Sequence, residues 1–512
     1  MTNAPSWTEG YVSDTAYTLG FYREMAPAFL DYAALINGHA APPQKGMRYC
    51  ELGCGRGYGT LVLAAANPDQ HYVGIDFNPE HIGEARGLAE RAGIGNVRFL
   101  EASFGDAARG SDAEPFDIVA LHGVYSWVSP QVQEDIHEFL RRRLAPGGLC
   151  YVSYNTLPGW AALTPLQYLL NQVADRASGD TLRRLRAGID VLKPLSEPKS
   201  GYVAANPLAR RRLESLATQP PEYLAHEYMN QHWRPLYVTE AMAQLAEAKL
   251  SYVGSAAIGE NRTGFSATQD IAPLFKEEVD PMLRELLKDF AVNKQFRRDM
   301  YGKGTPKLAN REIEQRYDAI VLAHTAPVPA ERAEWVVPAG SAKIDRRIVD
   351  TLLRALETGP ASIGTLRAAA AREGIAAGDV PPVIEILVHN RVLTPCRNPK
   401  DALDPAPAKR LNTLVFELAL ASDGHSYLAS PLLGSGIGAS YPERLFAPMV
   451  AAEAPDSPVG ATEALALLAR HDKKMDDQPG GATAREKLER MIGAIRNDTL
   501  PRWAALGIDA GV

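Results

Sequence analysis

Short apolar runs alternate with amphipathic stretches between residues 47 and 154, and this alternation predicts βαβ units in a mostly parallel sheet. In the amphipathic stretches apolar residues recur at helical spacing, and Pro79 suits the first turn of one of them. The predicted strands are Met47–Leu52, His71–Ile75, Val97–Glu101, Phe116–Leu121 and Leu149–Tyr154, and the predicted helices are Tyr58–Asn67, Pro79–Ala92 and Gln131–Leu144. We expect an α/β fold with a doubly wound sheet.

The pattern resumes much later in the chain. An amphipathic stretch at Thr239–Ala248 leads into a strand-like run at Leu250–Ala256, and another such run follows at Phe296–Tyr301. The segment Thr156–Trp233 separates the fifth strand from the helix at 239–248 and is therefore an insertion. Its pattern predicts mostly helices. Because ligands of such sheets bind beyond the carboxyl ends of the strands, we expect the insertion at 156–233 to cover the site as a lid.

The first domain is predicted to span residues 1–305, and two smaller domains to follow it. Prolines and polar residues at 326–343 indicate a boundary, and 340–397 then reads as three helices and a strand, a winged-helix-like pattern without a dense basic helix. We expect protein docking, dimer formation or recognition of a large substrate there. After a linker, 408–512 is predicted to be mostly helical, with a turn at Gly434–Gly438 that lacks the Lys-Ser/Thr ending of a phosphate-binding loop.

Composition narrows the class of partner. The 512 residues are 46% hydrophobic and 22% charged with a net charge of -7, which is typical of a globular protein and lacks the basic excess of a general nucleic-acid binder. The first residues show no signal-peptide pattern and no run is long enough to span a bilayer, so we expect a cytoplasmic protein without membrane insertion. The four cysteines form no C-x-x-C pair, and we expect reduced thiols and no metal site.

A glycine-rich loop carries the strongest chemical signal. Glycines stand at positions 53, 55, 57 and 59, directly after a predicted strand that contains Glu51. Such a loop turns a strand into a helix and lets bare backbone approach a ligand. Asp76 ends the second strand, where a carboxylate can accept hydrogen bonds from ribose hydroxyls. Glu51 would repel a diphosphate but attract a cationic amino-acid ligand. The glycine loop and Asp76 together therefore predict a site for a nucleoside that carries a cationic amino-acid group.

On these residues the chain resembles the class I S-adenosylmethionine-dependent methyltransferases, whose signature E-x-G-x-G-x-G matches Glu51, Gly53, Gly55 and Gly57. The resemblance implies a seven-stranded Rossmann-like sheet that ends in a reversed strand, here 296–301, and S-adenosylmethionine as the cofactor. Asp76 would bind the ribose hydroxyls, and residues at the end of the third strand would contact the adenine ring. The candidate cofactor-binding residues are Tyr17, Tyr22, Glu51, Gly53, Cys54, Gly55, Gly57, Asp76, Phe77, Asn78, Ala102, Ser103, Phe104 and His122.

Large aromatic residues cluster after the fourth and fifth strands. Such residues at the mouth of a sheet expose apolar surface unless a ligand or a lid covers them. A lysine amine, with an ordinary pKa of about 10.4, must be neutral to accept a methyl group, and a dry aromatic pocket beside a cation lowers that pKa. The candidate catalytic residues are His122 as a proton acceptor, Asn155 as an amide that holds the amine, and Tyr125, Trp127, Tyr154 and Trp160 as walls.

Four phrases narrow the resemblance to bacterial methyltransferases that carry a regulatory domain, a group that includes rickettsial enzymes that methylate lysines of an outer-membrane protein. The phrases begin at His122, Tyr154, His226 and Phe296, and the resemblance extends over residues 11–304. It implies a methyltransferase whose acceptor is a protein lysine. We therefore expect a protein substrate as partner, and the winged-helix-like part makes a homodimer possible. Two alternatives remain open: a small-molecule acceptor, and a non-catalytic scaffold that senses the cofactor.

Overall fold

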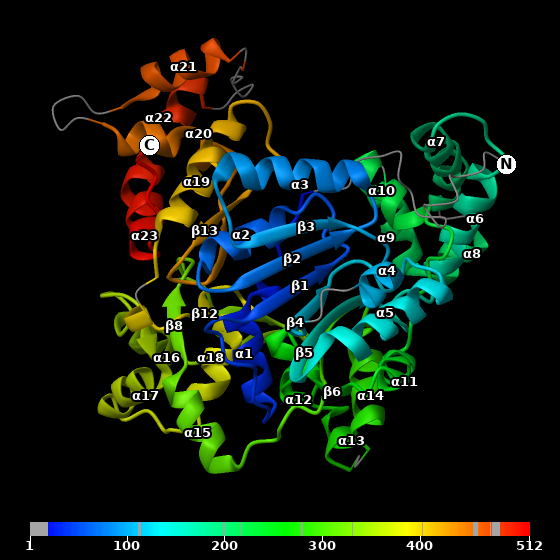
Figure 1. The fold of residues 1–512 in the computed structure, drawn as a ribbon, viewed down its shortest axis with the longest axis horizontal. Helices are drawn as coiled ribbons and strands as arrows, with labels where there is room; N and C mark the ends of the chain where they lie inside the picture. The colour runs from blue at the N-terminus through cyan, green and yellow to red at the C-terminus, as the bar shows by residue number, and fades with distance from the viewer. Residues whose placement is uncertain are drawn as a thin grey trace.

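The computed structural model describes residues 19–110, 114–197, 200–216, 218–277, 280–329, 331–401, 403–453, 459–471, 473 and 482–511. Its centre is a seven-stranded sheet in the order β3-β2-β1-β4-β5-β7-β6 (Figure 1). The strands are β1 Arg48–Leu52, β2 His71–Asp76, β3 Val97–Glu101, β4 Phe116–Leu121, β5 Leu144–Asn155, β6 Ser251–Ser255 and β7 Phe296–Gly302. β1 to β5 pair in parallel, while β7 is antiparallel to both β5 and β6. The predicted fold and the reversed strand are confirmed.

The helices between the strands begin at residues that satisfy their free backbone N–H groups. Asn78, Ser103 and Ser129 each accept a hydrogen bond from a first-turn N–H, and prolines follow Asn78 and Ser129 at the first helical position. The helices of this part are η2 Arg23–Met25, α1 Pro27–Ile36, α2 Tyr58–Ala66, α3 Pro79–Ala92, α4 Phe104–Arg109 and α5 Pro130–Arg143. η2 and α1 are separated at Ala26, whose backbone is extended immediately before Pro27.

Side chains of the sheet alternate between its two faces, and this alternation decides which residues reach the site. Tyr49, Tyr151 and Met300 belong to one hydrophobic cluster. Their neighbours Cys50 and Val152 belong to another cluster, on the opposite face. Because Tyr151 of β5 pairs with Met300 of β7, the residues that lie an even number of positions from Tyr151 in β5 or from Met300 in β7 face the same side of the sheet.

The insertion and the segment that returns to the sheet are helical. The insertion holds α6 Thr164–Ala174, α7 Thr181–Leu192, η3 Lys193–Ser196, α8 Gly201–Ala205, α9 Pro207–Leu216 and α10 Pro221–Tyr228. α11 Val238–Glu247 then precedes β6, and η4 Ile258–Glu260, α12 Thr263–Ser266, α13 Ala272–Glu277 and α14 Pro281–Val292 lie between β6 and β7. In Figure 1 the insertion forms a lobe of its own at the right of the sheet.

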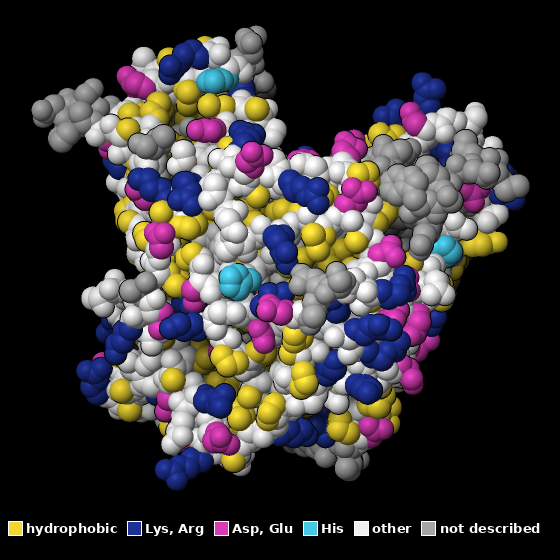
Figure 2. Space-filling view, viewed as in Figure 1, with side chains coloured by type: hydrophobic (Ala, Val, Ile, Leu, Met, Phe, Trp, Pro, Cys, Tyr) yellow, Lys and Arg dark blue, Asp and Glu magenta, His cyan; other side chains and the backbone are white. Residues whose placement is uncertain are grey.

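Two further groups of elements follow β7. The first holds α15 Asn310–Ala319, β8 Val321–His324, β9 Glu334–Val337, β10 Gly340–Lys343, α16 Arg346–Arg354, β11 Ala361–Ser362, α17 Ile363–Arg372, α18 Val380–His389 and β12 Leu393–Cys396. The second holds η5 Pro399–Asp401, α19 Ala406–Ala419, β13 Tyr427–Ser430, β14 Ser435–Gly438, α20 Tyr441–Ala451, α21 Ala461–Arg470, α22 Ala484–Ala494, η6 Ile495–Thr499 and α23 Leu500–Ala505. Charged side chains of both signs are interspersed over the face in Figure 2.

The β13–β14 hairpin packs against the first turn of α2. The hydroxyl of Tyr58 donates a hydrogen bond to the backbone oxygen of Tyr427 and accepts one from its N–H at 3.1 Å. The rings of Phe21 and Tyr427 lie 5.1 Å apart, and a Cβ atom on Gly436 would lie 2.8 Å from Val62. The C-terminal part of the chain therefore touches both the glycine loop's helix and the segment that precedes α1.

Two predicted elements differ from the structure, and one predicted domain boundary contains a hairpin. β5 begins at Leu144, where a helix was expected to end, because Leu144 pairs with Phe116 across a register shift in the ladder. The stretch 326–343, read as a boundary, contains the β9–β10 hairpin. The predicted turn at 434–438 contains β14, whose residues pair with β13 and thereby satisfy their backbone groups.

Candidate functional site

The loop after β1 holds three glycines in the left-handed backbone region. Gly53, Gly55 and Gly57 have φ angles of 71°, 53° and 72°, which side chains disfavour. A Cβ atom at Gly53 would lie 2.5 Å from Val124 Cγ2, and one at Gly57 would lie 2.6 Å from the Phe99 ring. At Gly55 no atom of the described residues lies within 4 Å of that position. The loop thus requires glycine for its path and its packing, and it leaves open space in front of Gly55.

Asp76 ends β2 and ties the glycine loop to the next turn. Its Oδ2 accepts a hydrogen bond from the backbone N–H of Gly55 at 2.9 Å, and its Oδ1 accepts one from that of Asn78 at 3.0 Å. His81 Nδ1 lies 3.4 Å from Oδ1. A carboxylate offers about four lone-pair sites, so Asp76 retains acceptor capacity for hydroxyl groups of a ligand.

Glu51 lies in β1 beside this loop and is buried. Its carboxylate accepts a hydrogen bond from the hydroxyl of Thr60. Burial raises the pKa of Glu51 to about 7; the Thr60 hydrogen bond opposes this shift and the negative charge of Asp76 reinforces it. A cation bound beside Glu51 would favour its ionised form and release its proton.

Two hollows meet at the end of the sheet. The leading-segment hollow is lined by Leu19, Gly20, Phe21, Tyr22, Met25, Glu51, Gly53, Cys54, Gly55, Arg56, Gly57, Tyr58, Gly59, Leu63 and His122. The Asp76 hollow is lined by Gly53, Gly55, Asp76, Phe77, His81, Ala102, Ser103, Phe104, His122, Gly123, Val124, Trp127, Val128, Ser129, Val132 and Asp135. They share Gly53, Gly55 and His122, so one extended ligand can occupy both.

Most of the expected cofactor-binding residues line one of these hollows. Besides Glu51, the glycines, Asp76 and His122, these are Tyr22, Cys54, Phe77, Ala102, Ser103 and Phe104. Asn78 lines neither hollow, and its side chain accepts a hydrogen bond from the N–H of Glu80 at 2.9 Å as the N-cap of α3. Tyr17 lies outside the described residues.

His122 lies at the junction of the two hollows. Its Nδ1 is 2.9 Å from the hydroxyl oxygen of Tyr151, and its ring stacks on Tyr22 with centroids 3.4 Å apart and an interplanar angle of 22°. The ring of Phe296 lies 5.8 Å from it. Burial and then the positive charge of Arg298 hold the pKa of His122 well below its ordinary value. The imidazole is therefore neutral and adds no positive charge at this point.

Tyr125 and Tyr154, which we expected to wall the site, are not brought to either hollow. Both belong to the cluster on the face opposite Tyr151. The hydroxyl of Tyr125 lies 2.8 Å from His137 Nε2, and that of Tyr154 donates to Asp299 Oδ2 at 2.6 Å. The reason is the two-residue period of a strand, which turns Tyr154 away from the side that Tyr151 faces.

The other three aromatic and amide candidates lie where the insertion meets the sheet. Trp127 lines the Asp76 hollow and packs in the same cluster as Trp160. The ring of Trp160 meets that of Trp233 edge to face at 5.0 Å. The Asn155 N–H donates to Ser126 Oγ at 2.9 Å, while its buried side-chain Nδ2 has no partner among the described residues. The insertion therefore contacts the site through Trp127.

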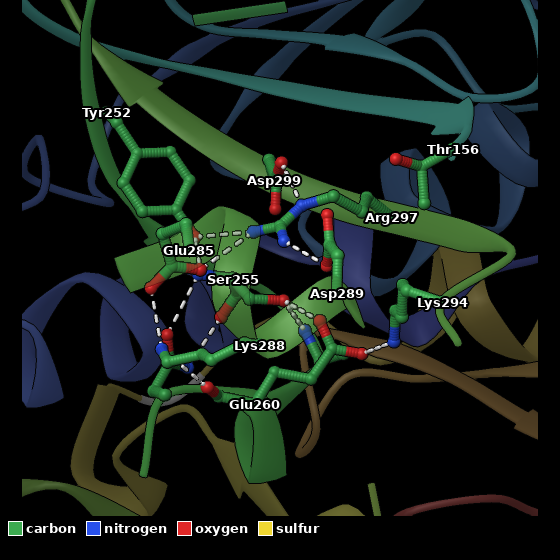
Figure 3. A network of polar contacts seen from close by, with 12 residues as sticks. Thr156, Tyr252, Ser255, Glu260, Glu285, Lys288, Asp289, Lys294, Arg297 and Asp299 are labelled. Carbon is green, nitrogen blue, oxygen red and sulfur yellow. Dashed lines mark hydrogen bonds and ion pairs between the residues drawn. The ribbon is translucent and has the colours of Figure 1, made fainter. Parts of the chain in front are cut away.

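An ionic network supports the end of the sheet from the face of Tyr154 (Figure 3). Arg297 is fully buried and donates to Asp299 at 2.7 Å, Asp289 at 2.6 Å and Glu285 at 2.9 Å. Its positive charge lowers the pKa of Glu285 against the effect of burial. These contacts fix β7 against α14 and so fix the register of the strand that carries Phe296 and Arg298.

Sequence reasoning missed three residues of the His122 surroundings. Tyr151 bonds His122, Ser153 Oγ accepts a hydrogen bond from the Gly123 N–H at 2.9 Å, and the charge of Arg298 lowers the pKa of His122. The two-residue period of β5 would have grouped Tyr151 and Ser153 with Asn155. The place of Arg298 depends on the register of β7 against β5, which the sequence does not indicate.

The described residues contain neither a group of three or more metal-ligating side chains nor a helix long and apolar enough to cross a membrane. The four cysteines are free thiols, three of them buried. Burial raises the pKa of the Cys50 and Cys396 thiols. These thiols are protonated and serve packing.

Two family models match the chain. One, described as a methyltransferase domain, matches residues 43–182, and the other, described as a predicted methyltransferase regulatory domain, matches residues 220–303. An uncharacterized Synechocystis protein is 34% identical over 513 residues, covering 98% of this chain and all of that protein. An uncharacterized Rickettsia prowazekii protein is 27% identical over 290 residues, 56% of this chain and 51% of its own length.

Solved structures show the same fold. PKMT2 from Rickettsia typhi, solved in complex with AdoHcy, superposes with a TM-score of 0.71 at 19% identity, covering 97% of this chain and 100% of that one. The similarity therefore includes the insertion and the elements after β7, which neither family model covers in full.

Proposed function

The chain belongs to the methyltransferases with a methyltransferase regulatory domain, and from this premise we propose that it transfers methyl groups from S-adenosylmethionine to lysine side chains of a protein. The donor is S-adenosylmethionine, as in the class I enzymes. The observation that carries the proposal is the pair of hollows that meet at a neutral His122. The insertion, which packs on Trp127 beside the Asp76 hollow, and the resemblance to rickettsial lysine methyltransferases support a protein acceptor.

The residues of the two hollows fit the donor. Asp76 keeps acceptor capacity for ribose hydroxyls, and the apolar rim of Phe104, Val124 and Val132 suits an adenine ring. Glu51 lies in the other hollow, where a carboxylate suits a cationic amino-acid end. Gly55 leaves the space that close approach of a ligand requires.

The donor, when bound, supplies a methyl group on a positively charged sulfur, which needs alignment and exclusion of water more than covalent help. His122 orients the acceptor: with Nδ1–H directed at the Tyr151 hydroxyl, its Nε2 accepts a hydrogen bond from the incoming amine. Tyr22 stacks on that ring and limits its rotation. Trp127 excludes water where the insertion meets the Asp76 hollow.

Labelled S-adenosylmethionine and a lysate of the source cell test the acceptor class. We expect label in protein, recovered as methylated lysine after hydrolysis, and much weaker label with His122→Ala. Label confined to small molecules would replace the acceptor by a metabolite. Binding of S-adenosylhomocysteine without any labelling would favour a scaffold that senses the cofactor.

A further inference from the structure

Two consecutive arginines of β7 have opposite surroundings. The guanidinium of Arg297 is enclosed by carboxylates on one face of the sheet (Figure 3), as described above. Arg298 points to the other face, and neither an ion pair nor a hydrogen bond joins its guanidinium to a described residue. Its Nε is buried without a partner. A half-buried cation without a counter-charge is unfavourable, and this makes its position a candidate for binding an anion.

The position of Arg298 connects it to the proposed site. It pairs with Ser153 across the β5–β7 ladder, and Ser153 holds the N–H of the residue after His122. The guanidinium lies over the ring of Phe296 at 5.3 Å, and that ring lies 5.8 Å from His122. The positive charge of Arg298 thus acts where an acceptor would approach His122.

Glu24, an acidic side chain on the segment before α1, does not neutralise this charge. Glu24, like Arg298, acts electrostatically on Tyr151, but its Oε1 lies 3.9 Å from Arg23 Nε. Arg23 in turn donates to the backbone oxygen of Val388 at 2.5 Å. The local balance of Arg23, Glu24 and Arg298 is therefore one positive charge.

We propose that Arg298 binds a carboxylate of the acceptor, so that the enzyme selects a lysine with an aspartate or glutamate beside it. This inference rests on the proposed function. A guanidinium presents a planar fork that matches a carboxylate, which an ammonium does not. The same positive charge disfavours a protonated lysine amine near His122, so the acceptor is bound in its neutral form.

A second source of the carboxylate is the donor itself. Arg298 lines neither the leading-segment hollow nor the Asp76 hollow, whereas Glu51 and Asp76 do. The geometry therefore favours the acceptor, and the experiment separates the two sources.

The test uses the full chain, tritiated S-adenosylmethionine and a pool of five-residue peptides with a central lysine and mixed neighbours. The variants are Arg298→Met, which removes the charge, and Arg298→Lys, which keeps the charge but loses the fork. Arg142→Met is the control, because Arg142 is exposed on α5 and pairs with Glu138 at 2.8 Å. Labelled peptides are sequenced, and affinities for S-adenosylhomocysteine and 5′-methylthioadenosine are measured by calorimetry.

We expect the unaltered enzyme and Arg142→Met to enrich Asp or Glu over Asn or Gln about tenfold, the ratio typical of a charge-assisted hydrogen bond. Arg298→Met should lose this enrichment with unchanged affinity for S-adenosylhomocysteine, and Arg298→Lys should keep part of it. Labelling without an acidic preference, or a preference that survives in Arg298→Met, would overturn the inference alone. A loss of affinity for S-adenosylhomocysteine but not for 5′-methylthioadenosine would assign Arg298 to the donor's carboxylate and overturn it too. Absence of any labelled peptide or lysate protein would overturn the proposed function together with the inference.

Discussion

The glycine loop after β1 and the aromatic ends of β4 and β5 lie at the same edge of the sheet, but they build the site by different means. In the first region backbone path and one carboxylate define the ligand space, as the contacts of Asp76 with Gly55 and Asn78 show. In the second region side-chain direction decides, so Tyr151 reaches His122 while Tyr154 bonds Asp299 on the opposite face. A backbone motif can be predicted from adjacent residues in the sequence. Whether a side chain reaches the site depends on which face of the strand it lies on.

The largest expected effect falls on the first region. Asp76→Ala should weaken binding of S-adenosylhomocysteine about a thousandfold, because it removes a charged acceptor and releases the Gly55 and Asn78 N–H groups. Calorimetry measures the affinity. Asp175→Ala is the control, since Asp175 is an exposed partner of Arg184 in the insertion. Retention of affinity within tenfold would place the ribose elsewhere.

In the second region the largest effect should be on turnover. His122→Ala should reduce the rate of methyl transfer about 100-fold, the cost of losing alignment of an acceptor, and should change the affinity for S-adenosylhomocysteine much less. His71→Ala, at an exposed position that begins β2, serves as the control. An unchanged rate at saturating acceptor would remove His122 from the reaction.

Between these regions, Glu51 predicts a dependence on pH. Donor affinity should rise about tenfold from pH 6 to pH 8, because the Glu51 pKa of about 7 leaves the carboxyl mostly protonated at pH 6 and a cationic ligand prefers the carboxylate. Binding at pH 6 should release close to one proton, seen as a buffer-dependent heat. Glu51→Gln should abolish both the pH dependence and the proton release.

The same shift has a defined sign for folding. The pKa of Glu51 is about 7 in the folded protein and 4.5 in the unfolded chain, so the folded protein binds this proton more tightly. Ionisation of Glu51 therefore opposes folding. The contribution of Glu51 to the stability of the free protein should therefore decline as the pH rises from about 4.5 to about 7. Urea unfolding of the unaltered protein and Glu51→Gln over this range measures the difference.

The smallest effect on turnover is expected at Tyr154. Tyr154→Phe should lower the free energy of unfolding by about 1–2 kcal/mol, because buried Asp299 loses a donor, while turnover changes less than about threefold. Tyr151→Phe is the matched variant on the other face, and it should reduce turnover more than stability. Equal effects of both variants on turnover would contradict the distinction between the two faces.

Local sequence patterns predicted the sheet, the α2 and α3 helices and the glycine loop, because hydrophobic period and helix-start residues act over a few positions. They did not predict that Leu144 begins β5 or that 434–438 contains β14, since both depend on a partner strand. The residues that contact His122 were not predicted for the same reason. Arg298 is brought opposite Ser153 by a ladder that joins residues far apart in the chain.

The contact between the β13–β14 hairpin and Tyr58 has a consequence for how the chain can be divided. A fragment that stops at residue 303, where the second family match ends, would leave Tyr58, Val62 and Phe21 without the neighbours that hold them. The hairpin supports the helix start that follows the glycine loop, 369 positions earlier in the chain. A protein fragment limited to the matched segments would thus contain the signature residues but lack the hairpin that packs against them.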